Sequence, residues 1–225
     1  MSRLILLFLS IPFVLSAEPE CPQRFVRFQR KPTVKNNHTR DWCFAVFPHE
    51  KAASRDYARG LCANYNSTLS IPQNLEEFHD ISKVWSVSKD AFERDLNKNF
   101  SNILIAVDGE FTPKCKATLV GDRNFKPEKD KGECGLHQDL FSFDSSKTDP
   151  TFALNHNIDG YPNGKVQHTT GDVSITMYAS CLAMDPDTYT KNHTLDPGHL
   201  HLTWCDGRDG ELENMYAVLC GRPPQ

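Results

Sequence analysis

Apolar residues alternate with polar ones near both ends of the chain, as they do in half-buried strands. Phe25, Val26 and Phe28 stand among basic residues, and residues 41–47 follow as an aromatic stretch with partial alternation. This pattern predicts two short strands, which we expect to pair as a hairpin with a cysteine in each arm. Three further apolar runs near the carboxyl end are typical of strands, each with one cysteine: residues 173–184, 199–205 and 215–221.

Residues 49–65 are rich in helix-forming residues and predict a first helix. Apolar side chains recur there every four residues, at Ala53, Tyr57, Leu61 and Tyr65. Residues at this spacing share one face of a helix, so we expect the stripe to pack against the core, with Cys62 beside it.

Asn74 stands where a second helix is expected to start. With Glu77 it resembles a capping box, in which the Asn side chain accepts a hydrogen bond from the helix backbone and the Glu side chain reaches back. The expected apolar face comprises Leu75, Phe78, Ile81 and Trp85. Residues 88–100 follow with poor periodicity, and we expect them to add a further helical turn or two.

Residues 102–107 form a short apolar run between turn residues, which predicts a buried strand. From residue 108 to residue 172 the chain becomes rich in Gly, Pro, Asp, Asn and Lys. A loop of this length inside a compact domain tends to be functional, so it is the first candidate for a binding surface. The order of strand, helix, helix, strand, long loop and strands predicts an α+β domain.

The first residues predict export. A basic residue precedes an apolar run over residues 4–15, and small residues follow at Ser16 and Ala17. This is the layout of a secretory signal peptide, so we expect residues 1–17 to be removed and residues 18–225 to form a single extracellular domain. A buried amino-terminal helix is the alternative. No later apolar stretch reaches the roughly 18 residues that a membrane span needs.

Charge and cysteine content narrow the class of protein. The net charge is −4, and Lys and Arg are scattered among Asp and Glu, so no basic stripe is available for a nucleic-acid partner. Eight cysteines follow the signal peptide, an even number that implies four disulfides in an oxidising compartment. No Cys-x-x-Cys pair is present, which argues against a zinc site. Counting alone leaves the disulfide pairing open.

Four Asn-x-Ser/Thr triplets are acceptors for N-linked glycans in an exported chain: Asn37, Asn66, Asn99 and Asn192. Glycans are bulky and solvated, so an occupied triplet lies at the surface. The sequence therefore predicts a glycoprotein.

Catalytic motifs are absent from the sequence. It contains neither Gly-x-Ser-x-Gly nor His-Glu-x-x-His, and the expected disulfides leave no cysteine thiol to act as a nucleophile. We therefore expect a protein that is not an enzyme.

The order of several short motifs resembles the C-type lectin-like domain family. WCF at residues 42–44 and LSIPQNLEE at residues 69–77 are similar to the first half of that domain. A long loop with GYPN, followed by CLAM, WCDG and YAVLCG, is similar to its second half, so the resemblance spans residues 21–220. It implies a C-type lectin-like fold with two helices flanking small antiparallel sheets, a long loop region and four disulfides. The style is nearest to secreted invertebrate members, for which innate immunity is a common role.

The resemblance also implies a disulfide pairing. It joins the first helix to the last strand, closes the amino-terminal hairpin and places one bridge beneath the long loop. The implied pairs are Cys62 with Cys220, Cys181 with Cys205, Cys21 with Cys43, and Cys115 with Cys134.

Calcium-binding members of the family use a Glu-Pro-Asn or Gln-Pro-Asp turn and a Trp-Asn-Asp strand to hold one ion against a sugar. The matching residues here are Tyr161, Pro162 and Asn163 in the turn and Trp204, Cys205 and Asp206 in the strand. Tyr161 replaces the first oxygen ligand and Cys205 replaces the middle Asn, so only Asn163 and Asp206 remain as metal ligands. Calcium needs about six to eight oxygen ligands. We therefore expect no cofactor, with weak calcium binding as the alternative.

The resemblance and the long loop together predict a secreted recognition protein. We expect it to bind a glycan or an extracellular protein through residues 108–172 and 206–214, without family-style calcium coordination of a sugar. The expected ligand-binding residues are Tyr161, Pro162, Asn163, Trp204 and Asp206, with the Tyr161 ring stacking on a sugar or packing under its own loop. Two alternatives stay open: a calcium-dependent carbohydrate-binding lectin, and a non-catalytic inhibitor or structural secreted protein.

Overall fold

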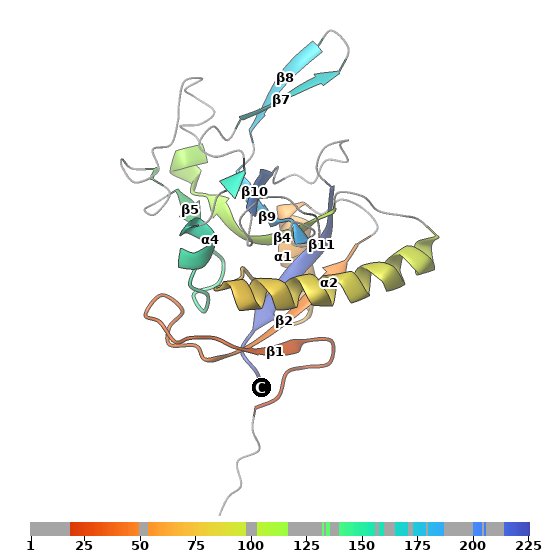
Figure 1. Cartoon of the computed structure of the whole chain (residues 1–225). Helices are drawn as coiled ribbons and strands as arrows, with labels where there is room; N and C mark the ends of the chain where they lie inside the picture. Colours follow the sequence, from red (N-terminus) through yellow and green to blue (C-terminus); the bar gives the residue numbers. More distant parts are fainter. Residues whose placement is uncertain are drawn as a thin grey trace, which may run out of the picture.

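The computed structural model in Figure 1 describes most of the chain. The described residues are 19–49, 54–97, 103–116, 132, 134–135, 140–155, 158–159, 165–170, 173–178, 180–186, 200–203, 205 and 214–225. Every structural statement below refers to these residues.

Nine of the described strands form one sheet, and two more form a separate hairpin. The strands of the sheet are β1 (Val26–Gln29), β2 (Asp41–Pro48), β3 (Thr68–Leu69), β4 (Ile103–Phe111), β5 (Phe141–Ser142), β6 (Ile158–Asp159), β9 (Cys181–Met184), β10 (Leu200–Thr203) and β11 (Asn214–Arg222). Their order is β1-β2-β11-β4-β9-β10-β6, with β3 beside β11 and β5 beside β4. The hairpin consists of β7 (Lys165–Thr170) and β8 (Val173–Tyr178).

The large sheet is mixed, whereas the family resemblance implied small antiparallel sheets. Strand β4 runs parallel to β11, and β6 runs parallel to β10; the other pairs are antiparallel. Parallel neighbours need a long crossover between them, and the whole stretch from residue 112 to residue 213 separates β4 from β11. The expected hairpin of β1 and β2 is confirmed.

Two helices cover opposite faces of the sheet, as expected from the sequence. Helix α1 spans Arg55–Asn64 and helix α2 spans Leu75–Leu96. Because strand side chains alternate between faces, β2 contributes to two cores. Trp42, Phe44 and Val46 pack in the core that contains Phe78, Ile81 and Trp85 of α2. Cys43, Ala45 and Phe47 pack in the one that contains Ala58 and Cys62 of α1. In Figure 1, α2 crosses the near face of the sheet.

Helix α1 begins later than expected and is rotated. Ser54 caps it by accepting a hydrogen bond from the Tyr57 N–H, and its buried residues are Arg55, Ala58 and Cys62. The predicted stripe was wrong at Tyr57, which is 40% exposed. The disulfide from Cys62 to Cys220 of β11 explains the rotation, because it turns the Cys62 side of the helix toward the sheet.

Helix α2 follows its predicted start closely. The Asn74 side chain accepts a hydrogen bond from the Glu77 N–H at 2.8 Å. The helix runs as one piece to Leu96, so the expected extra turns beyond residue 88 are confirmed. Phe78, Ile81 and Trp85 are buried as predicted, but Leu75, the first residue of the helix, is 37% exposed.

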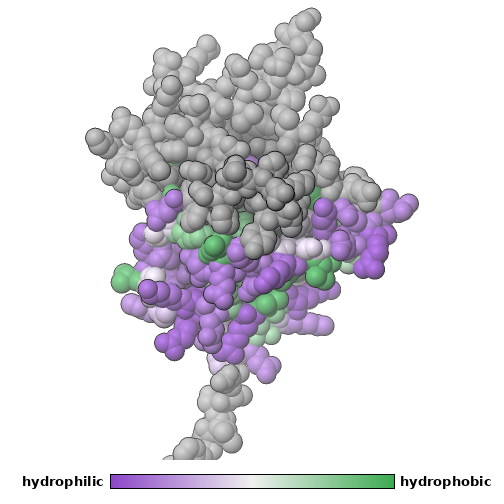
Figure 2. All heavy atoms as spheres, viewed as in Figure 1, coloured by the Kyte–Doolittle hydropathy of each residue, from purple (hydrophilic) through white to green (hydrophobic). Residues whose placement is uncertain are grey.

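The region 108–172 contains more regular structure than the sequence predicted. Strand β4 continues to Phe111, and β5, β6, β7 and the short helix α4 (Thr151–Asn155) follow. These pieces are too brief to show a clear hydrophobic period, so sequence patterning assigned the region to a single loop. On the face shown in Figure 2, the described residues are mainly hydrophilic, with apolar residues in scattered patches.

All eight cysteines are paired, and the pairs are those that the family resemblance implies. The disulfides are Cys21–Cys43, Cys62–Cys220, Cys115–Cys134 and Cys181–Cys205. The first closes the β1–β2 hairpin, the second joins α1 to β11, the third lies within the region 108–172, and the fourth joins the start of β9 to the residue that follows Trp204. Three of the four therefore have one cysteine in a strand of the large sheet, namely Cys43, Cys220 and Cys181.

Candidate functional site

The predicted ligand-binding residues Tyr161, Pro162, Asn163, Trp204 and Asp206 lie outside the described residues, and so do the metal ligands predicted among them. The site is therefore built from the strands that lead into these residues and from the side chains that support them. The frame of the site, as we call it, consists of the carboxyl ends of β4, β6 and β10, the Cys181–Cys205 disulfide and residues 144–149.

Strands β6 and β10, which precede the two predicted motifs in the sequence, end at the same edge of the sheet. They are parallel neighbours, with Ile158 opposite Leu200 and Asp159 opposite His201. Parallel strands end at the same edge of a sheet. Tyr161 follows the end of β6 by two residues, and Trp204 follows β10 directly. In the sequence, the two motifs therefore follow the ends of two adjacent strands.

Cys205 fixes the chain immediately after β10. Its sulfur is bonded to Cys181, the first residue of β9. Its carbonyl oxygen accepts a hydrogen bond from the backbone N–H of Arg55, the first residue of α1, at 2.7 Å. The Ser180 N–H also donates to the carbonyl oxygen of Thr203 at 3.0 Å. Helix α1, β9 and β10 thus meet at this point.

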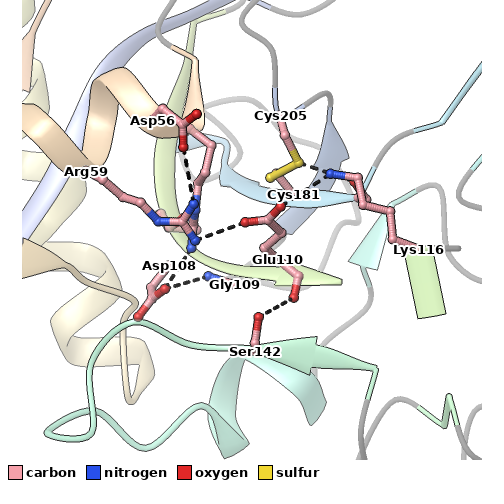
Figure 3. The surroundings of a disulfide bond; sticks show 12 residues. Asp56, Arg59, Asp108, Gly109, Glu110, Lys116, Ser142, Cys181 and Cys205 are labelled. Carbon is pink, nitrogen blue, oxygen red and sulfur yellow. Dashed lines mark hydrogen bonds and ion pairs between the residues drawn. A yellow bond between two sulfur atoms is a disulfide. The ribbon is translucent and has the colours of Figure 1, made fainter. Parts of the chain in front are cut away.

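The disulfide determines what this part of the site can do with a metal. Glu110, Cys181 and Cys205 lie close enough together to suggest a ligand group (Figure 3). Both sulfurs are consumed by the disulfide, and the Glu110 carboxylate accepts hydrogen bonds from Arg59 at 2.9 Å and Lys116 at 3.3 Å. The family resemblance aligns Cys205 with the calcium-ligating Asn, and a bonded sulfur supplies no hard oxygen. These described residues do not fit a calcium centre.

Asp108 anchors the region 108–172 to the body of the domain. Its carboxylate, 0% exposed, accepts hydrogen bonds from Arg55 Nη2 (2.9 Å) and from the N–H groups of Gly109 (2.9 Å), Asp144 (3.0 Å) and Ser145 (3.1 Å). Burial raises the pKa of the Asp108 carboxyl, and the charge of Arg55 and the backbone donors oppose that rise. One buried carboxylate therefore holds α1, β4 and residues 144–145 together.

Gly109 allows this arrangement. The pairing of β4 with β9 is irregular between Ala106 and Glu110, and Gly109 has a φ of 122° within that interval. A Cβ at this position would lie 2.6 Å from a side-chain carbon of Leu182. Glycine is the residue that accepts such a backbone conformation and such a close approach.

Arg59, which is partly exposed, forms a second group of ion pairs beside Asp108 and Arg55. Its guanidinium donates to Asp144 at 2.8 Å and to Glu110 at 2.9 Å, and it lies 3.5 Å from Asp56 (Figure 3). Partial burial raises the pKa of the Asp144 carboxyl, but the hydrogen bond from Arg59 and the charges of Arg55 and Arg59 lower it by more. The pKa of Asp144 is therefore held below its ordinary value.

A second buried arginine holds the same segment from the α2 side of the sheet. Arg30 and Glu77 are 2% and 0% exposed and form an ion pair. The Arg30 guanidinium also donates to Thr148 Oγ1 at 3.2 Å and to the Lys147 carbonyl at 3.3 Å, and it lies 4.3 Å from the centre of the Trp42 ring. Residues 144–149 are therefore fixed at one end by Asp108 with Arg55 and at the other by Arg30 with Glu77.

Sequence reasoning did not find these two ion pairs. Glu77 was interpreted only as a capping residue. Its carboxylate does reach back, accepting a hydrogen bond from the Gln73 N–H at 3.0 Å, but it also forms the ion pair with Arg30. The sequence feature that could have indicated a buried ion pair was Asp108, a lone charge that directly follows the apolar run of residues 102–107. A charge in that setting is rarely fully buried without a partner.

Among the residues that the structure describes, no helix has both the length and the apolar character that crossing a bilayer requires.

Comparison with known proteins identifies relatives over nearly the whole chain. The C-type lectin domain-containing protein 158 of Caenorhabditis elegans is 25% identical over 212 residues, covering 92% of this chain and 90% of the relative. Two solved structures have weaker similarity. They are the carbohydrate-recognition domain of cow CD23 with a GlcNAc2Man3 oligosaccharide (16% identity, TM-score 0.44, covering 92% of this chain and 98% of that one) and human lithostathine (10% identity, TM-score 0.44, covering 91% of each).

A family model also matches most of the chain. Residues 27–223 match the family described as C-type lectin domain-containing protein 141/158. The match covers far more than half of the chain, so the fold is C-type lectin-like and the resemblance to this family, with its invertebrate relative, is confirmed. The chain belongs to the C-type lectin domain-containing protein 141/158 family.

Proposed function

We propose that this chain is a secreted, non-catalytic recognition protein that binds a glycan without coordinating it through calcium. Its binding surface would comprise residues 108–172 and 206–214, centred on Tyr161, Asn163 and Asp206. The observation that carries the calcium independence is the bond between the sulfurs of Cys205 and Cys181, because the family resemblance aligns Cys205 with a calcium-ligating Asn.

The arrangement of the frame supports a binding role. Strands β6 and β10 end side by side, so residues that follow them can act on one ligand. The Tyr161 ring would stack on a sugar face, and the amide of Asn163 and the carboxylate of Asp206 would hydrogen-bond its hydroxyl groups. Residues 144–149 are already fixed by two buried ion pairs, so this part of the surface is ordered before a ligand arrives.

A glycan array tests the ligand class and the metal independence together. The secreted protein is applied with calcium and, in parallel, with EDTA. We expect the same pattern of bound glycans in both conditions, with binding lost in Tyr161→Ala. Binding that requires calcium would contradict the proposal. A calcium site would be supported if added calcium raised the melting temperature of the parent but not of Asn163→Ala or Asp206→Ala. Absence of glycan binding in both conditions would favour an extracellular protein as the partner.

The proposal includes the processing of the chain. Residues 1–17 would act as a signal peptide and residues 18–225 would form a single extracellular domain. Sequencing of the amino terminus of protein collected from the medium of an animal cell culture checks this: the mature chain should begin at Glu18. Retention of the full chain inside the cell would contradict it.

A further inference from the structure

Two of the four glycosylation triplets lie among the described residues, and both occupy exposed turns. Asn37 lies between β1 and β2, and Asn66 lies between α1 and β3. Both have left-handed backbone conformations, with φ of 52° and 50°. Asn is one of the few residues with a side chain that adopts this conformation readily. Asn99 and Asn192 lie outside the described residues.

The side chains of Asn37 and Asn66 are available for attachment. A glycan replaces a hydrogen on Nδ2, so an acceptor cannot use that nitrogen to hold the fold together. Within the described part of the chain, neither Asn37 nor Asn66 makes a side-chain hydrogen bond. Asn36 provides the contrast: it is buried, belongs to no triplet, and its Nδ2 donates to the carbonyl oxygens of Lys31 and Thr39 at 3.0 and 3.2 Å.

The turn that carries Asn37 is well anchored by its neighbours. Asn36 N–H donates to Thr33 Oγ1 at 3.1 Å, and Thr33 Oγ1 in turn donates to Asp149 at 2.8 Å. Lys35 Nζ donates to Thr151 Oγ1 at 2.8 Å. These contacts hold the turn without using Asn37, so a glycan there would leave them intact.

Strand order separates both positions from the edge at β6 and β10, although the turn that carries Asn37 contacts Asp149 and Thr151 of the region 108–172. Asn66 lies two residues before β3, which pairs with β11 through Leu69 and Cys220, and Asn37 belongs to the connection of β1 and β2. The order β11-β4-β9-β10-β6 places β6 four strands away from β11, or about 19 Å at the usual spacing between strands. Helix α1 gives a similar separation, because its first residue touches Cys205 and its ten residues extend for about 15 Å toward Asn66.

We infer that Asn37 and Asn66 carry N-linked glycans, which cover the β1–β2–β11 half of the domain and leave the edge at β6 and β10 free. Strand β1 is the outermost strand of the sheet on the glycan-bearing side, and its Val26 is 41% exposed. An open strand edge can pair with another chain, and a bulky solvated group near it hinders such pairing. The inference rests on the proposed export, because N-linked glycans are added in the secretory pathway.

Site occupancy is measured on the mature chain secreted by animal cells, once with residues 1–17 and once with the host's own leader in their place. Glycosidase digestion in heavy-oxygen water followed by peptide mass spectrometry marks each Asn that carried a glycan. We expect both Asn37 and Asn66 to be marked. Absence of the mark at either residue in protein exported by the host leader would overturn the inference. Failure of export with residues 1–17 alone would count against the proposed secretion only.

Matched variants separate the triplet from the asparagine itself. Thr39→Ala and Thr68→Ala remove one triplet each and should each lower the mass by one glycan, whereas Thr39→Ser and Thr68→Ser keep the triplet and should keep the glycan. Enzymatic removal of the glycans should leave the glycan-array pattern unchanged and increase self-association in sedimentation. A changed array pattern with an unchanged melting temperature would contradict the separation of glycans from the ligand site.

Discussion

Replacing Asp108 with Asn tests whether the buried carboxylate holds the frame of the site. The variant removes one negative charge and leaves Arg55, itself 4% exposed, with only the more distant carboxylate of Asp144, at 3.6 Å, to balance its positive charge. The Asn side chain has one acceptor and two N–H donors in place of two acceptors, while its surroundings consist of four donors: Arg55, Gly109, Asp144 and Ser145. Either orientation of the amide therefore directs N–H groups at other N–H groups.

The expected loss follows from these contacts. Breaking a buried ion pair by removing one partner costs about 3 kcal/mol or more of unfolding free energy. For a domain of this size, that loss corresponds to a fall of about 6–12 °C in melting temperature. Because Asp144 and Ser145 donate their backbone N–H groups to the lost carboxylate, their amide hydrogens should also exchange faster with solvent.

The assay combines urea unfolding under oxidising conditions with amide hydrogen exchange. Asp56→Asn is the matched control, because the Asp56 side chain is 96% exposed and its pairing with Arg59 is worth little in water. We expect the control to change stability by less than about 0.5 kcal/mol. A loss below about 1 kcal/mol in Asp108→Asn, with unchanged exchange at residues 144 and 145, would refute the reasoning.

Three further substitutions test other buried or partly buried contacts of the domain. Arg30→Met leaves the Glu77 carboxylate buried without its cation and should cost about 3 kcal/mol or more in urea unfolding. Asp144 has a folded pKa below its ordinary value, so its contribution to stability is present above about pH 4 and disappears as the pH falls through the folded pKa. Urea unfolding of Asp144→Asn and the parent should therefore differ at neutral pH and converge in acid. Gly221→Ala places a Cβ 2.5 Å from the Trp42 ring and should cost about 1–3 kcal/mol, measured as a lower melting temperature.

Each of these changes has a control in the same chain. Lys31→Met removes an exposed cation next to Arg30 and should leave stability nearly unchanged. Asp90→Asn, at an exposed position of α2, should not alter the acid profile in the way that Asp144→Asn does. Gly60→Ala lies in α1 with open space around the new methyl group and should stabilise the domain by up to about 1 kcal/mol. Equal effects in a variant and its control would contradict the assigned contact.

Local sequence patterns predicted the helices and strands that depend on interactions between residues close in sequence. The alternation in residues 41–47 predicted β2, and the Asn74 cap predicted the start of α2. Long-range contacts left no such pattern. Arg30 and Glu77 are 47 residues apart, and Arg55 and Asp108 are 53 apart, so no local spacing indicated that either pair would meet in the interior.

The orientation of α1 also depends on a contact between residues far apart in the sequence. Its four-residue spacing favoured a face with Tyr57, but the disulfide joins Cys62 to a residue 158 positions away and decides which side turns inward. The mixed sheet also depends on distant partners, because β4 and β11 become neighbours only when the chain between them has returned. For the candidate site, sequence indicated the turn and strand motifs, and the pairing of β6 with β10 shows why they start from one edge.

The two anchors of residues 144–149 have a consequence for the thermodynamics of recognition. Asp108 with Arg55 fixes one end of this segment and Arg30 with Glu77 the other, so its backbone loses its conformational freedom when the domain folds. A ligand that contacts the segment then meets a preorganised surface and incurs no further ordering cost there. Affinity in this part of the protein is therefore coupled to folding stability: variants that loosen either arginine should weaken binding through a larger entropic penalty, even though neither arginine lies at the surface.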